Sequence, residues 1–84
     1  QTYSYQDLMG RIPTRQKEVL IAIAKEGQAV GVNSGTFIKK HHLHSSSSVQ
    51  SSLRALLNED IVTMQDGVYR VYDYFFAYWL RSNY

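Results

Sequence analysis

The chain has 84 residues, 44% of them hydrophobic and 19% charged, which is enough for one small globular domain and no more. It contains no cysteine, so a disulfide framework, a thiolate zinc site and a cysteine nucleophile are excluded. No apolar run approaches the roughly 18 residues that a membrane helix needs, and no secretory signal opens the chain. We therefore expect a cytoplasmic protein without a membrane contact. The first residue is Gln1 and not Met, so we also expect a processed product or a piece of a longer protein.

The net charge of +2 is unevenly distributed along the chain. Residues 1–26 carry +1 and residues 59–84 carry −2, whereas residues 27–58 carry +3 and contain no acidic residue. Clustered positive charge without opposing acid is typical of a surface that meets a polyanion. Three charges also fit an ordinary solvated surface, so this pattern leaves both readings open.

The first part of the chain predicts two helices. Apolar residues at helical spacing indicate a short helix over residues 3–12, with Ser4 as its N-cap. A stronger helix follows, with Thr14 as the expected cap; it runs through Lys25 and stops at Gly27.

The middle of the chain predicts a strand and two more helices. Residues 29–32 form a short apolar run that indicates one strand or an extended connector. Asn33 or Ser34 then caps a helix that ends near residue 41. After a tight turn, Ser45 or Ser46 caps a fourth helix over residues 46–58. That helix has a stripe of four aliphatic residues on a period of 3.6: Val49, Leu53, Leu56 and Leu57.

The last part of the chain predicts a hairpin and a final helix. Residues 61–65 and 68–71 flank Asp66-Gly67, a strong type I′ turn signal. The turn pairs Val62 with Val71 and Met64 with Tyr69, which agrees with the alternation of apolar residues.

A final helix follows Asp73, its expected N-cap. Eight of the eleven aromatic residues lie in residues 69–84. This helix must therefore dock on the domain, on a neighbour or on another copy, and we expect docking within the domain.

The order of these elements predicts the fold class, which is mainly α with a small β-hairpin (α+β). Helix, short strand, helix, tight turn, helix and hairpin is the order of a winged helix-turn-helix, here with an extra N-terminal and an extra C-terminal helix. Residues 34–41 and 46–58 would form the helix-turn-helix pair, the second being the recognition helix. The hairpin would be the wing, and residues 29–32 would add a third strand to it.

This fold predicts a set of nucleic-acid-binding residues. The recognition helix would turn its serine-rich face outward, with a glutamine and an arginine on one flank. Two lysines end the preceding helix, where phosphates usually pass, and one arginine projects from the wing. The predicted residues are Lys39, Lys40, Ser47, Gln50, Ser51, Arg54 and Arg70. An alternative remains open, because serines also solubilise a surface and lysines also complement a helix dipole.

We expect neither a catalytic residue nor a metal site in this chain. His41 and His44 could share a face and hold zinc or nickel with a third donor, but no carboxylate lies nearby in the sequence to orient them. We favour turn histidines exposed near a phosphate. No nucleophile elbow is present, and the adjacent Glu59 and Asp60 fit a helix end better than an acid/base pair.

Residues across the predicted helix-turn-helix, wing and last helix together resemble one known family. They are Phe37-Ile38-Lys39-Lys40-His41, Leu43, Ser45, Ser47-Ser48-Val49-Gln50, Leu53-Arg54-Ala55-Leu56-Leu57, Val68-Tyr69-Arg70-Val71 and Asp73-Tyr74-Phe75-Phe76-Ala77-Tyr78-Trp79-Leu80. The set resembles the C-terminal winged-helix region of prokaryotic AAA/STAND-type P-loop ATPases, and residues 16–25 are similar to that family's first core helix. The likeness covers about residues 3–81. Its most specific part is the ending, where the family carries Tyr-x-Val-x-Asp-x-x-Phe-x-x-Trp-Leu.

The resemblance implies an upstream ATPase domain in the same polypeptide, and ATP with magnesium in that parent protein. No G-x-x-x-x-G-K-[ST] occurs in these residues, so no cofactor is expected in this chain. One departure is the turn at residues 41–44, which reads His-His-Leu-His where glycine commonly sits. It predicts a left-handed histidine or a different turn.

Three functions are compatible with these observations. The favoured one is DNA binding by a non-catalytic winged-helix domain within a larger ATPase. The alternative is a regulatory module that packs on the ATPase core or on a protein partner without touching DNA, which the low charge and the aromatic last helix favour. A free-standing transcription regulator is the third, and the resemblance speaks against it.

Overall fold

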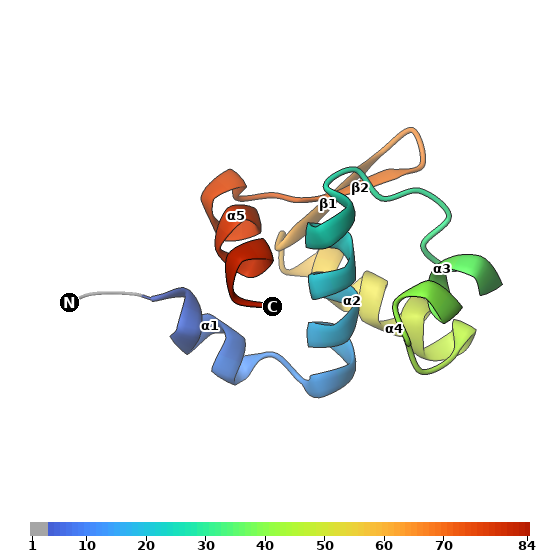
Figure 1. Cartoon of the computed structure of the whole chain (residues 1–84), viewed down its shortest axis with the longest axis horizontal. Coiled ribbons are helices and arrows are strands. Elements are labelled where there is room, and N and C mark those ends of the chain that lie inside the picture. The colour runs from blue at the N-terminus through green and yellow to red at the C-terminus, as the bar shows by residue number, and fades with distance from the viewer. Residues whose placement is uncertain (1–3) are drawn as a thin grey trace.

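Five helices and one β-hairpin follow one another in residues 4–84, the part of the chain that the computed structural model describes (Figure 1). The elements are α1 (Tyr5–Arg11), α2 (Thr14–Glu26), α3 (Gly35–Lys40), α4 (Ser46–Asn58), β1 (Val62–Gln65), β2 (Val68–Val71) and α5 (Tyr74–Asn83). The predicted α+β winged-helix order is confirmed. The predicted first helix includes residue 3, which lies outside the described residues.

Capping hydrogen bonds explain where three of the helices begin. Ser4, Ser34 and Ser45 each accept a hydrogen bond from the backbone N–H three residues further on, at 3.1–3.2 Å. Such a bond satisfies one of the N–H groups that the first turn of a helix leaves unpaired. Of the alternative caps, Ser34 is therefore chosen over Asn33, and Ser45 over Ser46.

Helix α2 begins one residue earlier than predicted. Thr14 is its first residue and not its cap; Pro13 occupies the cap position and makes no side-chain hydrogen bond there. Proline suits a helix start because it has no N–H to satisfy and its φ is already restricted. The end is as predicted: Gly27 adopts a φ of +76°, which a residue with a Cβ rarely reaches, and its N–H bonds to the carbonyls of Ile23 and Ala24.

Helix α2 lies at the centre of the domain. It packs against α4, α5 and β2, and Figure 1 shows it between α5 on one side and the α3–α4 pair on the other. Its inner residues are almost completely shielded from solvent and form the middle of one continuous apolar core. The core residues of α2 are Val19, Leu20, Ala22, Ile23 and Ala24.

The hairpin has the predicted register. Val62 pairs with Val71 and Met64 with Tyr69 in an antiparallel two-stranded sheet. The turn residues Asp66 and Gly67 both have positive φ, 53° and 77°, as a type I′ turn requires. The first strand begins one residue later than expected.

The predicted third strand is reduced to a single residue pair. Ala29 and Tyr69 exchange two backbone hydrogen bonds of 2.8 and 2.9 Å, and no longer ladder joins them in the described residues. The chain turns away at Gly31, where φ is +59° and the carbonyl accepts a hydrogen bond from the N–H of Ser34. Residues 29–32 are therefore a connector that touches the wing at one point. The apolar run is explained by burial, since Ala29 and Val32 belong to the core.

The last helix docks within the domain through one face. Phe76, Ala77 and Leu80 are buried, and the Tyr5 ring of α1 stacks on Phe76 with ring centres 4.8 Å apart. The Tyr5 hydroxyl also donates a hydrogen bond of 3.2 Å to Asp73, which caps α5. Partial burial and then the Asp73 carboxylate raise the pKa of Tyr5 above 10.0. The expected docking within the domain is thus confirmed for the inner face of α5.

Candidate nucleic-acid interface

The turn between α3 and α4 is held by backbone hydrogen bonds. His42 adopts a left-handed conformation, with a φ of +56°. This is one of the two outcomes expected for a turn that has histidine where glycine commonly sits. The next residue, Leu43, is buried and donates its N–H to the carbonyl of Ile38 at 2.9 Å. Ser46 bonds to the side chain of Asn33 at 2.9 Å, which ties the start of α4 to the start of α3. These hydrogen bonds join the two helices in one helix-turn-helix unit.

The outer face of α4 is polar and free of acidic residues. Ser47, Gln50, Ser51 and Arg54 are all exposed, while Val49 and its stripe face α2. Within residues 4–84 the side chains of Gln50, Ser51 and Arg54 have no hydrogen-bond or ion-pair partner, so they are free to meet a ligand. Ser47 Oγ lies 3.4 Å from the capping serine's Oγ.

The two lysines of α3 differ in their surroundings. Lys39 is exposed and has no ion-pair partner in the described part of the chain. Lys40 Nζ lies 2.9 Å from Glu26 Oε2, the last residue of α2, so its charge is partly compensated. Residues 27–58 contain no acidic residue, but the fold brings Glu26 next to Lys40. Lys39 is therefore better suited than Lys40 to bind a phosphate.

Glu26 also binds one of the three histidines, His41, whose side chain is only 12% exposed, whereas His42 and His44 are exposed as expected. Glu26 Oε2 lies 2.7 Å from His41 Nε2, and the His41 ring packs against Phe37 with centres 4.5 Å apart. The hydrogen bonds from Lys40 and then from His41 hold the pKa of Glu26 below 4.5. The carboxylate that the sequence lacks beside the histidines is thus supplied by α2, 15 residues away. Within residues 4–84, no three histidine or carboxylate side chains come together as metal ligands would.

The wing presents one arginine. Arg70 is exposed on β2, on the strand face opposite to the buried Val71, as the alternation predicts. Asp66, at the tip of the hairpin, borders the same shallow hollow as Arg70. The wing therefore offers a single phosphate ligand with an acidic tip.

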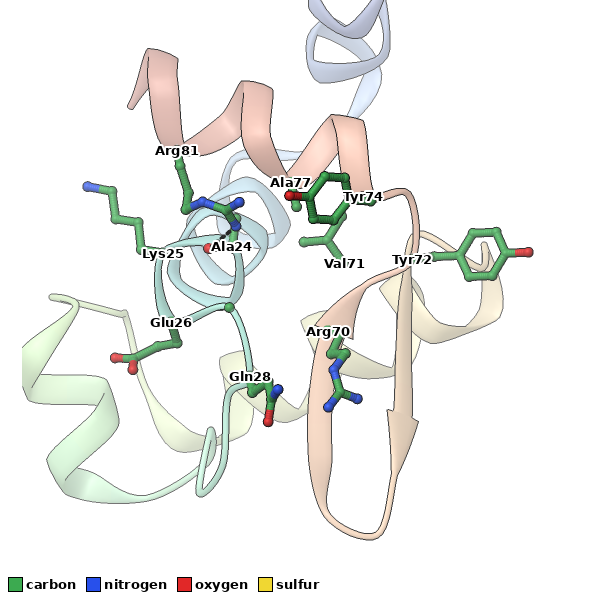
Figure 2. Close-up of a pocket in the computed structure, with 11 residues that line it drawn as sticks. Ala24, Lys25, Glu26, Gln28, Arg70, Val71, Tyr72, Tyr74, Ala77 and Arg81 are labelled. Carbon is green, nitrogen blue, oxygen red and sulfur yellow. Dashed lines mark hydrogen bonds between the residues drawn. The ribbon is translucent and has the colours of Figure 1, made fainter.

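A second surface was not found from the sequence. A groove of about 600 Å³ runs between the end of α2, β2 and α5. Figure 2 shows Arg70 and Arg81 on two of its walls, with the Tyr74 ring at the α5 side and Lys25 at the outer edge on α2. The spacing of Tyr74, Ala77 and Arg81, at i, i+3 and i+7 on one side of α5, is the signal that could have pointed to it.

This arrangement defines a winged helix-turn-helix domain: α3 and α4 are the helix pair, and the hairpin is the wing. The comparison with family models agrees, because residues 3–82 match the family described as "Probable winged helix domain". The chain belongs to this family. A winged helix domain is typically non-catalytic, and the family description names no parent protein. No curated protein and no solved structure gave a significant match. In the described part of the chain, no helix has the length and apolar character needed to cross a bilayer.

Proposed function

We propose that this domain binds duplex DNA through the outer face of α4, as a non-catalytic part of a larger prokaryotic ATPase. The observation that carries the proposal is the set of free polar side chains on α4: Gln50, Ser51 and Arg54 project from the second helix of a helix-turn-helix and are not used by the fold. In this motif the second helix enters the major groove. Glutamine and arginine can each form paired hydrogen bonds with a base edge there.

The flanking cations would hold the DNA backbone. Lys39 at the end of α3 and Arg70 on the wing lie on elements that flank the recognition helix in this fold, and both are exposed. Phosphate contacts fix orientation and supply most of the salt-dependent affinity. With Arg54, they make three contacts. Three contacts give a slope of log affinity against log salt of about −2.7, which is weak for specific recognition. The domain would therefore act together with other DNA-binding parts of its parent.

The larger ATPase to which this domain would belong is also a proposal. The likeness of the chain to the C-terminal region of AAA/STAND-type ATPases supports an upstream P-loop domain on the same polypeptide, which would bind ATP and magnesium in the cytoplasm. In this arrangement the winged helix would report DNA contact to the ATPase domain or anchor it on DNA.

The test is a fluorescence-anisotropy titration of the domain with random duplex DNA at two salt concentrations. From 50 to 200 mM salt we expect the affinity to fall by about 40-fold. Arg54→Ala should weaken binding and make the slope less steep by about one unit. Arg15→Ala is the matched control, because this arginine lies on α2 in an ion pair with Glu18. Absence of binding at 50 mM salt, or equal binding by the Arg54 variant, would overturn the proposal.

A second candidate function is a protein-contact module, and the outer side of α5 favours it. Phe75 and Tyr78 are 71% and 63% exposed, although side chains of this size normally contribute to cores or interfaces. On this alternative the domain packs through α5 on the ATPase core or on a partner. It becomes the better explanation if the duplex titration fails at low salt.

A further inference from the structure

Three cationic residues line the groove between α2, β2 and α5. Lys25 comes from the last turn of α2, Arg70 from β2 and Arg81 from α5. The Arg81 guanidinium donates a hydrogen bond of 3.1 Å to the carbonyl of Ala24, which holds it at the groove while it keeps its charge. Figure 2 shows Arg81 at one end of the groove and Arg70 across from it, while the Lys25 side chain extends from α2 toward the outer edge of the groove.

The acidic residue that lines this groove does not neutralise it. Glu26 is the single carboxylate among the lining residues, and its Oε2 is bound by Lys40 and His41 at 2.9 and 2.7 Å. In Figure 2 the Glu26 side chain points away from the groove. The residues that line the groove therefore keep an excess of positive charge.

An aromatic ring stands in the same groove. Tyr74 is 71% exposed, and Figure 2 shows its ring near Val71 and Ala77 at the α5 wall. Its ring neighbour in the described residues is Phe75, which meets it edge-on with an interplanar angle of 82°. Tyr72, also 71% exposed, projects from the rim. An aromatic ring that is exposed and not packed in the core can stack on a planar group of a ligand.

We propose that this groove binds single-stranded nucleic acid, with backbone phosphates on Arg70 and Arg81 and a base stacked on Tyr74. A site for single-stranded nucleic acid has two parts. Cationic side chains bind the phosphates of the nucleic-acid backbone, and aromatic rings stack with its unpaired bases. An intact duplex cannot use the ring, because its bases are already stacked within the helix. An acidic peptide would use the cations but gain nothing specific from the ring. The site shares Arg70 with the proposed duplex contacts but not the α4 face, and it adds a second nucleic-acid contact to the proposed function on which it rests.

The experiment is an anisotropy titration of the whole chain with a labelled oligothymidine of about 12 nucleotides, a length within the usual span of single-strand sites. Tyr74→Ala should weaken binding by about 5- to 150-fold, the range expected for the loss of one stacked base. Tyr74→Phe keeps the stacking face and should bind as the native chain does. Since Tyr74 is exposed at the first position of α5, both variants should fold, and equal unfolding midpoints would confirm this.

A second strand of the same length and charge but without bases separates stacking from charge attraction. We expect the native chain to bind this abasic strand about as weakly as Tyr74→Ala binds oligothymidine. Arg81→Gln should weaken both strands, because it removes a phosphate contact and leaves the ring in place. Equal binding of the two strands by the native chain would overturn the proposal. So would full displacement of oligothymidine by poly-glutamate at the same charge concentration, which would identify the groove as a site for acidic protein segments.

The two nucleic-acid proposals fail in different ways. Arg54→Ala should weaken duplex binding and leave oligothymidine binding unchanged, whereas Tyr74→Ala should do the reverse. A chain that binds oligothymidine but no duplex would refute the α4 proposal alone. A chain that binds duplex but no single strand would refute the groove proposal alone.

Discussion

Helices α4 and α5 both pack against α2, but they present opposite kinds of outer surface. The outside of α4 carries serine, glutamine and one arginine, whereas the outside of α5 carries Tyr74, Phe75 and Tyr78, each at least 63% exposed. The inner faces are alike, with Leu56 of α4 and Leu80 of α5 completely buried. Stability therefore determines the inner face of each helix and leaves the outer face free. We therefore expect the two outer faces to bind different kinds of partner.

The largest expected change in stability comes from the buried leucines on the inner faces of α4 and α5. Leu56→Ala and Leu80→Ala should each lower the free energy of unfolding by about 2–5 kcal/mol, because each leaves a cavity in the core. Urea denaturation followed by circular dichroism measures this. A loss below about 1 kcal/mol for Leu80→Ala would mean that α5 is not docked as described.

The next effect compares the caps of the two helices. Asp73→Ala and Ser45→Ala should each cost about 0.5–2 kcal/mol of stability. The Asp73 variant should lose more, because this carboxylate accepts two backbone N–H groups and the Tyr5 hydroxyl. Asp73→Asn and Ser45→Thr keep a capping oxygen and should remain close to native in the same denaturation experiment. A larger loss for Ser45→Ala would contradict this ranking.

A smaller change in stability depends on pH and concerns the contacts of Glu26 with the end of α3. The folded-state pKa of Glu26 lies below 4.5, so the contribution of its ionised carboxylate to stability is fully present above about pH 4.5 and is lost as pH falls through the folded value. Glu26→Gln should therefore unfold at a lower temperature than the native chain at pH 7, and the gap should close in acid. Thermal melts at pH 7, 5 and 3 measure it. A gap that widens at pH 3 would refute the assignment.

The smallest effect belongs to the outside of α5. Phe75→Ser and Tyr78→Ser should change stability by no more than about 0.5 kcal/mol, since both side chains lie outside the core. The measurement is the urea titration used for the leucine variants. A loss above about 1 kcal/mol for either variant would show that this face is covered within the domain, and the proposed contrast between α4 and α5 would then fail.

Most of the fold could be predicted because its signals are local. The stripe and bounds of residues 46–58, the Asp66-Gly67 turn with its register, and the caps at Ser4 and Asp73 depend on residues only a few positions apart. The exception is the expected strand at residues 29–32. Its apolar character comes from burial against the core and not from pairing along the wing, and a short apolar run does not distinguish these two cases.

The candidate sites were predicted less completely, because they depend on contacts between distant segments. Sequence alone determined the polar outer face of α4, since helical periodicity places those residues opposite the buried stripe. Only the tertiary structure decided that Glu26 compensates Lys40 and orients His41, and that Lys25, Arg70 and Arg81 share a groove with Tyr74. The physical reason is that hydrogen bonds along the backbone act over three or four residues. Ion pairs and grooves depend on how whole helices pack, which the order of residues within one element does not reveal.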